Sequence, residues 1–339
     1  MPEEIEALGQ LTPVRPDGFV MRDANGQASY HEGLPADVRH WRDADALRAL
    51  LLYWGDAVGN VLLGDLARDR FVNAPAPVAT ATHHYPRLAA EALTTGDTWS
   101  SAGGEQPKFC TWSDRGHVLV KFSVAEDNPI ATRWRDLLLA EHLALQTLAT
   151  AGVSTAASRV VDVGVQRFLE LDRFDRVGAL GRRALMSLAA LDGEFVGKQT
   201  AAWPVVTAEL ARQKVITAQA HAGATLLYAF GTLIGNTDMH AGNLSFVSDQ
   251  GRPYGLSPAY DMLPMAFSPT AGGVVMDTVS SAHLHPAVDG ATWRAAHALA
   301  QTYLARLRSD TRFSAAFQTC IEALHMHLAD ASNKIGRLA

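Results

Sequence analysis

Three polar side chains suited to phosphoryl transfer follow one another between Gly235 and Asp261. Asp238 and Asn243 lie in a polar loop, and Asp261 follows after one predicted hairpin. Phosphoryl transfer requires a carboxylate that orients the acceptor hydroxyl, an amide oxygen for one Mg²⁺ and a second carboxylate between metal and phosphates. The sequence therefore predicts a catalytic loop with Asp238, followed by a metal loop that ends at Asp261.

The spacing inside this stretch supports the chemical interpretation. Asn243 lies five positions after Asp238, which is the step between the catalytic aspartate and the metal-binding asparagine of protein kinases. Asp and Asn beside Gly also form ordinary turns, and for each residue taken singly this alternative stays open. The three residue types in the required order favour the catalytic interpretation.

A lysine in a strand and a glutamate in the next helix are predicted to pair. Lys121 follows the apolar residues 118–120, and a helix is predicted over 131–151. Glu141 falls on the apolar stripe of this helix, where a charge is costly unless it is paired. The other members of the stripe are Trp134, Leu138, Leu145 and Leu148. Two alternatives stay open, in which Lys121 or Glu141 lies at an edge and reaches water.

A flexible stretch of small residues precedes the strand that carries Lys121. Its members are Ser100, Ser101, Ala102, Gly103 and Gly104. Two strands are predicted directly after it, at 109–113 and 117–122. Glycines let backbone N–H groups approach phosphate oxygens, so this arrangement is typical of a loop that covers a nucleotide. A plain connection is the alternative, and the stretch is not a Walker A motif because no helix follows it.

The remaining pattern divides the chain into a β-rich first part and a helical second part. The predicted elements are a helix at 43–54, a turn and buried strand at 55–64, strands at 160–165 and 168–174, and helices at 207–220, 222–234, 291–309 and 313–329. Residues 171–174 form the hinge between the parts, where adenine would bind through backbone groups. Arg173 and Arg176 either form structural ion pairs or contact the ligand.

The composition is that of an ordinary globular protein of 339 residues, with 48% hydrophobic and 19% charged residues. The formal net charge of −6 and the pI near 6.1 argue against direct binding of nucleic acid, although a local basic patch stays open. Cys110 and Cys320 lack metal-ligand spacing and are expected to be reduced thiols. The amino terminus is acidic and no apolar run could span a membrane, so the chain is expected to be soluble and cytoplasmic.

Taken together, these motifs resemble the HipA-like serine/threonine kinases, the toxins of bacterial type II toxin–antitoxin modules. The resemblance covers residues 85–335 and extends more weakly to the start of the chain. It rests on the loop 101–108, Val120-Lys121, Glu141, Arg173-Phe174-Asp175-Arg176, the loop 235–243 and Pro258-Ala259-Tyr260-Asp261.

The resemblance implies an α+β, bilobed protein-kinase-like fold with ATP and Mg²⁺ between the lobes. Residues 85–176 would form a β-rich N-lobe with the Gly-rich loop. Residues 177–339 would form an all-α C-lobe with the catalytic and metal loops. Residues 1–84 would form a partial, atypical N-terminal subdomain. The resemblance therefore does not carry over to this chain the surface on which the family usually binds its DNA-binding antitoxin.

The resemblance also implies a role for each site residue. Asp238 would orient the acceptor hydroxyl and accept its proton, while Asn243 and Asp261 would hold Mg²⁺. Lys121, braced by Glu141, would contact the phosphates. His240 is a catalytic candidate that shapes the loop, and a purely structural histidine is the alternative. The expected nucleotide contacts are Ser100, Ser101, Ala102, Gly103, Gly104, Lys121, Glu141, Asp172, Phe174 and His240.

The acceptor implied by the resemblance is a serine of a protein, often an aminoacyl-tRNA synthetase, with growth arrest as the outcome. A helix-turn-helix (HTH) antitoxin is the candidate partner. The family also phosphorylates a serine of its own Gly-rich loop, which inactivates the enzyme; Ser101 occupies that position and Ser100 is the alternative. Three other functions stay open: a small-molecule kinase, a catalytically silent kinase-fold binding module, and a DNA-associated protein that acts through an HTH partner.

Overall fold

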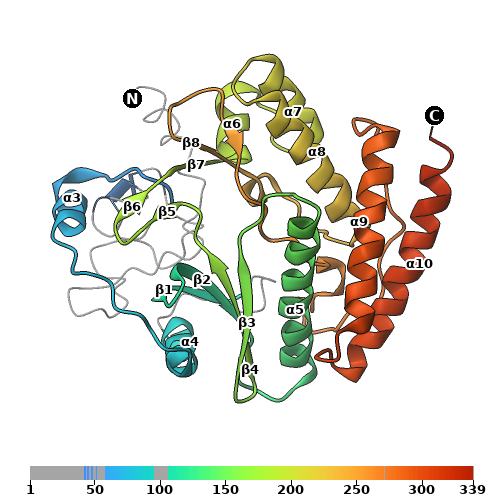
Figure 1. Cartoon of the computed structure of the whole chain (residues 1–339), viewed down its shortest axis with the longest axis horizontal. Helices are drawn as coiled ribbons and strands as arrows, with labels where there is room; N and C mark the ends of the chain where they lie inside the picture. Colours follow the sequence, from blue (N-terminus) through green and yellow to red (C-terminus); the bar gives the residue numbers. More distant parts are fainter. Residues whose placement is uncertain are drawn as a thin grey trace.

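The computed structural model describes residues 58–94, 106–270 and 272–338, with isolated positions between Arg42 and Leu51 (Figure 1). The strands are β1 (Lys108–Ser113), β2 (Gly116–Phe122), β3 (Ser158–Val163), β4 (Gln166–Asp172), β5 (Arg176–Val177), β6 (Gly181–Arg182), β7 (Ala184–Ser187), β8 (Ser245–Ser248) and β9 (Gly255–Leu256). The α-helices are α3 (Gly64–Val72), α4 (Tyr85–Thr94), α5 (Pro129–Thr150), α6 (Leu188–Phe195), α7 (Trp203–Arg212), α8 (Ala218–Leu233), α9 (Gly290–Ser309) and α10 (Gln318–Ile335). Short 3-10 turns are η3 (Thr82–His84), η5 (Ala241–Asn243), η6 (Met265–Phe267) and η7 (Ala315–Phe317).

Strands β1 to β4 form an antiparallel sheet in the order β1-β2-β4-β3. Successive side chains of a strand point to opposite faces of the sheet. Val118, Val120 and Phe122 of β2 pack in a small core with Tyr85 of α4. Lys121 lies between them in sequence, so its side chain points to the other face, which α5 covers (Figure 1). The strands predicted in this region are confirmed, with ends shifted by one or two residues.

Helix α5 brings Glu141 to the covered face of the sheet. Asn128 caps the start of the helix, because its Oδ1 accepts a hydrogen bond from Ala131 N at 2.9 Å. Pro129 suits the first turn, where no backbone N–H is needed, and Gly152, at φ +82°, follows the end of the helix. The predicted helix over 131–151 is therefore confirmed, and Glu141 is fully buried.

The second part of the chain is built around α8, which packs against α7, α9 and α10. Ala224, Leu227 and Phe230 of α8 are buried in the large core that α5 shares. Thr217 caps the start of α8, since its Oγ1 accepts a hydrogen bond from Ala220 N at 3.0 Å. The other end of α8 leads directly into the predicted catalytic loop.

Three expectations for the elements need correction. The second part is not all-α, because β7, β8 and β9 form a small antiparallel sheet in it. The β8–β9 hairpin was predicted, but β7 pairs with a strand distant in sequence and has no local signal. The helix expected at 207–220 ends at Arg212, because Lys214 adopts φ +60°. Residues 58–63 form no strand, and helix α3 begins directly after them at Gly64, whose φ is +80°.

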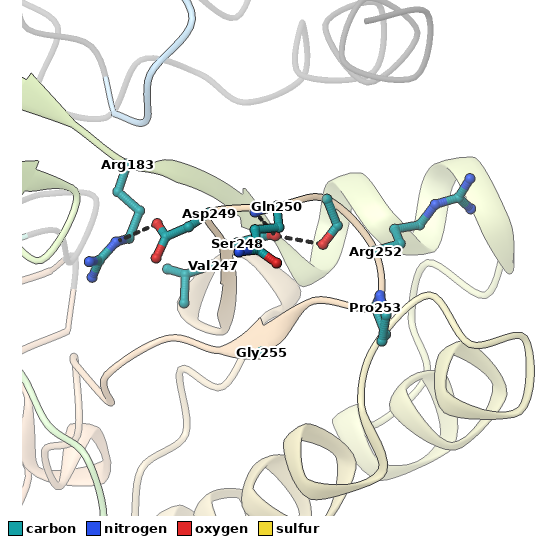
Figure 2. A pocket seen from close by; sticks show the side chains of 9 residues that line it. Arg183, Val247, Ser248, Asp249, Gln250, Arg252, Pro253 and Gly255 are labelled. Atoms are coloured by element: carbon teal, nitrogen blue, oxygen red, sulfur yellow. Dashed lines mark hydrogen bonds and ion pairs between the residues drawn. The ribbon is translucent and has the colours of Figure 1, made fainter.

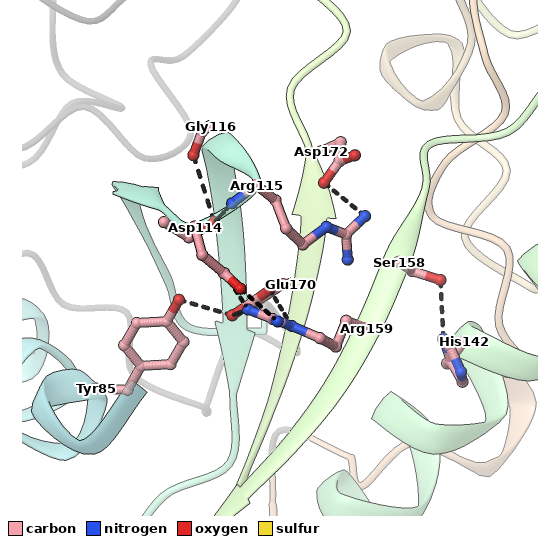
Figure 3. A network of polar contacts seen from close by, with 10 residues as sticks. Tyr85, Asp114, Arg115, Gly116, His142, Ser158, Arg159, Glu170 and Asp172 are labelled. Carbon is pink, nitrogen blue, oxygen red and sulfur yellow. Dashed lines mark hydrogen bonds and ion pairs between the residues drawn. The ribbon is translucent and has the colours of Figure 1, made fainter. Parts of the chain in front are cut away.

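A buried carboxylate anchors α4 to the sheet (Figure 3). Glu170 of β4 accepts a hydrogen bond from Tyr85 OH at 2.7 Å, and Arg159 of β3 donates to both its oxygens at 2.8 and 2.9 Å. Arg159 also pairs at 2.7 Å with Asp114 in the β1–β2 turn. Because Tyr85 and Arg159 satisfy the buried Glu170 carboxylate, this network can attach both α4 and the β1–β2 turn to the sheet.

Among the described residues, no helix has the length and apolar character needed to cross a membrane.

Acid is expected to weaken the fold through His142 of α5, whose Nδ1 lies 2.9 Å from Ser158 Oγ (Figure 3). Burial lowers the pKa of His142 to about 4, whereas an unfolded histidine titrates near 6.5. The unfolded state therefore binds the proton more readily, and stability is lost as the pH falls from about 7 towards 4, by roughly 3 kcal/mol. His142→Gln should flatten the pH profile of denaturant unfolding, while His83→Gln on the surface should not. If the free energy of unfolding of His142→Gln falls with pH as steeply as that of the wild type, titration of His142 is not the cause of the acid sensitivity.

Candidate active site

Lys121, Glu141 and Asp261 meet between the sheet and the helical part. Lys121 Nζ lies 2.8 Å from each carboxylate oxygen of Glu141 and also contacts Asp261 Oδ1. The lysine comes from β2, the glutamate from α5 and the aspartate from the loop after β9. The Glu141 side chain is 0% exposed and that of Asp261 is 29% exposed, so the aspartate is the carboxylate that reaches solvent. One ammonium group thus joins three elements that are distant in sequence.

Burial and the neighbouring charges set the protonation of this cluster. Burial alone would lower the pKa of Lys121, but the charges of Asp261 and Glu141 raise it above its ordinary value. Burial raises the pKa of Glu141, and Lys121 offsets only part of this shift. Burial also opposes ionisation of Asp261, yet Lys121 holds the pKa of that carboxyl below its usual range. A cation therefore faces an ionised, solvent-reaching carboxylate at neutral pH.

The backbone of Asp261 adopts φ +58°, a region that residues other than glycine seldom occupy. Asn236 supports this conformation, because its Nδ2 donates to the Asp261 carbonyl at 3.1 Å. The Oδ1 of the same buried side chain accepts a hydrogen bond from Asp238 N at 3.1 Å. Asn236 therefore ties the predicted metal loop to the predicted catalytic loop. Sequence reasoning assigned it no role, and its place in the loop was its only signal.

Asp238 and Asn243 are joined within the catalytic loop. Asn243 Nδ2 donates a hydrogen bond to the Asp238 carbonyl at 2.8 Å. This bond uses the amide nitrogen of Asn243 and does not involve its amide oxygen. Asn243 is buried, whereas the Asp238 side chain is 51% exposed. Burial raises the pKa of Asp238; His240 opposes the shift and Asp261 adds to it. An accessible carboxylate with a raised pKa is suited to accepting a proton.

His240 lies on the exposed side of this loop. Its Nε2 is 4.0 Å from Asp238 Oδ1, and its Nδ1 accepts a hydrogen bond from Gly242 N at 3.0 Å. Trp203 Nε1 donates to the His240 carbonyl at 3.2 Å. These contacts fix the backbone beside Asp238, which is what a histidine that shapes the loop would do.

The hinge reaches the site through Phe174. Its ring centroid lies 5.7 Å from that of Tyr260, the residue before Asp261. Tyr260 OH donates to the Gly242 carbonyl at 2.9 Å and shares a hydrogen bond of 2.7 Å with Ser245 Oγ. Tyr260 thus joins the predicted hinge, the predicted catalytic loop and the predicted metal loop. Sequence reasoning gave it no role, although its position beside Asp261 was a signal.

Two groups of expected site residues lie elsewhere or are not described. Asp172 pairs with Arg115 at 2.7 Å on the sheet (Figure 3), rather than with the Lys121 cluster. Arg173 and Arg176 both pair with Asp175, at 2.8 and 2.5 Å, so both form structural ion pairs. The expected phosphate-loop contacts, Ser100, Ser101, Ala102, Gly103 and Gly104, lie outside the described residues.

The residues that follow the undescribed loop lie at the edge of the site. Gln106 Nε2 donates to the Phe122 carbonyl. Lys108 is directly opposite Lys121 in the β1–β2 register. The charge of Lys108 also helps to lower the pKa of Asp261. Gln106 and Lys108 therefore lie beside the strand that carries Lys121.

The donors at the site fit Mg²⁺ and a nucleoside triphosphate. Mg²⁺ takes hard oxygen ligands, commonly one or two carboxylates together with waters and phosphates. Asp261 offers an ionised carboxylate that reaches solvent, and Asn243 offers an amide oxygen. Lys121 places a buried positive charge beside Asp261, and phosphate oxygens require such a charge.

A cavity of about 510 Å³ opens at the turn between β8 and β9 (Figure 2). It is lined by Arg183, residues 247–253 and Gly255, and Arg183 pairs with Asp249 across it at 3.0 Å. None of these lining residues belongs to the Lys121 cluster or to the catalytic loop. The site is therefore located by its converging charges rather than by the volume of a pocket.

Comparison with known proteins gives matches over nearly the whole chain. A family model described as the HipA-like C-terminal domain matches residues 100–329, and one described as the YjjJ-like toxin, middle domain, matches residues 10–72. Toxin YjjJ of Escherichia coli (strain K12) is 37% identical over 337 residues, which are 97% of this chain and 76% of that protein.

Two solved structures extend the comparison. A chain of the Shewanella oneidensis MR-1 complex of HipA, HipB and operator DNA aligns with a TM-score of 0.58 and 16% identity, over 88% of this chain and 80% of that chain. The Helicobacter pylori proinflammatory kinase CtkA aligns with a TM-score of 0.44 and 14% identity, over 68% of this chain and 88% of that chain. The likeness to the Shewanella complex confirms the expected α+β fold class.

Proposed function

Because this chain belongs to the HipA-like toxin family, we propose that it is an ATP- and Mg²⁺-dependent protein serine/threonine kinase. The observation that carries the proposal is the convergence of Lys121, Glu141 and Asp261 beside a loop with Asp238 and Asn243. Phosphoryl transfer depends mainly on positioning and charge stabilisation, and this constellation supplies both.

Each residue of the constellation has a distinct task. Asp238 orients the acceptor hydroxyl and takes its proton, for which its exposure and raised pKa are suited. Lys121, fixed by Glu141, holds phosphate oxygens. Asn243 and Asp261 hold Mg²⁺, which when bound neutralises charge on the phosphates. Phe174 and Tyr260 form the apolar edge of the site on the hinge side.

We infer that the acceptor is a serine or threonine of a protein and that its modification arrests growth, as the toxin relative suggests. An aminoacyl-tRNA synthetase is the first candidate substrate, and an HTH antitoxin is the candidate partner. Self-phosphorylation is proposed at Ser101, with Ser100 as the alternative. Cys110 and Cys320 are both in the thiol form, which suits the proposed action in the cytoplasm.

The test is transfer of radiolabelled phosphate from ATP with and without Mg²⁺, first to the protein itself and then to a bacterial lysate. Label that appears in protein only with Mg²⁺ is the expected result. Label confined to small hydroxyl compounds would replace the proposal by a small-molecule kinase. Absence of both nucleotide binding and transfer would leave a catalytically silent binding module.

Asn236→Ala is expected to slow phosphate transfer without preventing folding. The change removes the two hydrogen bonds that tie Asp261 to Asp238, and a small misplacement of reacting groups can lower kcat roughly 10- to 100-fold. Steady-state kinetics and thermal unfolding measure the two effects separately. The surface variant Asn333→Ala is the matched control. Wild-type kcat in Asn236→Ala would rule out this linking role.

A further inference from the structure

The chain before helix α3 is bonded to the hinge through a buried aspartate. Asp175 comes directly after the hinge residues 171–174, and its side chain is 5% exposed. Gly59 N donates to Asp175 Oδ2 at 3.1 Å, and Arg176 Nη1 donates to the Gly59 carbonyl at 3.3 Å. Both polar groups of the Gly59 backbone are therefore held by residues next to the hinge.

Two arginines make this attachment rigid. Arg173 donates to both oxygens of Asp175, at 3.1 and 2.8 Å, and Arg176 Nη1 donates to Oδ2 at 2.5 Å. Burial opposes ionisation of Asp175, but the two arginines hold the pKa of its carboxyl below the usual range. Hydrogen bonds to a buried, ionised carboxylate are among the stronger ones in proteins. The aspartate and its donors therefore act as one unit, which we call the Asp175 clamp.

The same clamp touches the helical part of the chain. Arg183 N donates to the Asp175 carbonyl at 3.0 Å. Gly59 is buried against β7, and a Cβ built on it would lie 3.5 Å from both N and O of Leu185. The backbone of Gly59 also has φ +79°, where a side chain would be strained. Position 59 is thus fitted closely between the hinge and the strand that pairs with β8.

A second contact is made by Phe71, near the end of α3. The guanidinium of Arg182 in β6 lies 5.6 Å from the ring centroid of Phe71 in α3. Figure 1 shows the β5–β6 hairpin beside α3. We call residues 58–60 together with α3 the docking segment. Through Gly59 the docking segment contacts Asp175 and Arg176, which follow the hinge residues. Through Phe71 it contacts Arg182 of β6.

We propose that Asp175 is a positioning residue through which the docking segment holds the hinge, so that nucleotide affinity depends on the docked state of residues 58–72. The inference rests on the proposed function, because it takes the hinge backbone as the site of the adenine base. Release of the clamp would let the hinge backbone shift and weaken binding of the base. The Lys121 cluster and the catalytic loop contain none of these residues, so the chemical step would continue once ATP is bound.

The coupling must work in both directions. If docking of residues 58–60 favours nucleotide binding, bound nucleotide must favour docking by the same factor. Hydrogen exchange at the Gly59 amide reports docking, because this N–H donates to Asp175. Exchange in the wild-type protein is therefore expected to slow further when ATP and Mg²⁺ are added.

The decisive variant is Asp175→Asn in the full chain, with Asp249→Asn on the neighbouring turn as the matched control. In Asp175→Asn we expect faster exchange at residues 58–60 without nucleotide. Loss of a charged hydrogen-bond partner should raise the Kd and KM for ATP about tenfold, while kcat at saturating ATP stays within about twofold. A merely structural role would lower kcat through loss of folded enzyme and leave KM unchanged. Asp249→Asn should behave as wild type.

Gly59→Val gives a second variant that leaves every charge in place. It should raise the KM for ATP in the same way, so the inference can be tested even if Asp175→Asn does not fold. Faster exchange with an unchanged Kd in either variant would overturn the coupling, and unchanged exchange would overturn the clamp. Failure of the wild-type protein to bind ATP would instead refute the proposed function.

Discussion

Phosphate transfer is expected to stop in Asp238→Asn and in Asp261→Asn. The first change removes the carboxylate that we propose orients the hydroxyl and accepts its proton, and general-base catalysis alone contributes about 10²- to 10⁴-fold. The second removes the ionised carboxylate that we propose holds Mg²⁺, and it leaves Lys121 paired with Glu141. Transfer of radiolabel from ATP measures the loss. Because Asp238 is half exposed, thermal unfolding of its variant should match that of wild type.

The mass of the intact protein provides an independent reading of the same result. Self-phosphorylation adds roughly 80 Da per phosphoryl group, and this increment should occur in wild type and be absent from both variants. Peptide mapping would then place the phosphate on Ser101 or Ser100. Asp127→Asn is the control, because its side chain is 94% exposed on the surface. Substantial transfer in either active-site variant would remove the assigned roles.

Lys121→Met is expected to have the largest effect on stability. It leaves Glu141 fully buried without its cation and removes the partner of Asp261. Breaking a buried ion pair by deleting one partner costs about 3–5 kcal/mol. Denaturant unfolding measures this loss, and phosphate transfer should be lost as well, because the phosphates lose their cation.

The loss should depend on pH in a defined direction. Burial already raises the pKa of Glu141, and removal of Lys121 raises it further. A carboxyl whose folded pKa is raised contributes stability below its unfolded pKa and loses it as the pH rises through the folded pKa. Lys121→Met should therefore be most destabilised at neutral pH and recover towards pH 4.

The double variant Lys121→Met with Glu141→Gln separates charge from packing. Glutamine needs no cation, so the double variant should be more stable at neutral pH than Lys121→Met alone, although neither should transfer phosphate. If both variants unfold at the same denaturant concentration, the buried charge is not the source of the loss. Arg183→Met, which breaks a surface pair with Asp249, should change stability little.

The sequence by itself determined the residue types and the local elements of this protein. Asp238, Asn243 and Asp261 stand in an order that phosphoryl transfer requires, and this order needs no tertiary information. The strands around Lys121 and the helix that carries Glu141 follow from local periodicity and from caps such as Asn128. These features depend on neighbours within a few positions, so they can be read along the chain.

Only the tertiary structure decided how these elements meet. The left-handed backbone of Asp261, its support by Asn236 and the contact of Tyr260 with Phe174 join segments far apart in sequence. The ion pair between Asp172 and Arg115 and the hydrogen bond from Gly59 N to Asp175 also join segments far apart in sequence. Such contacts depend on how the sheet, the hinge and the helical layer pack, and residues that satisfy the same periodicity can pack in several ways. Their side chains therefore find partners that no local pattern encodes.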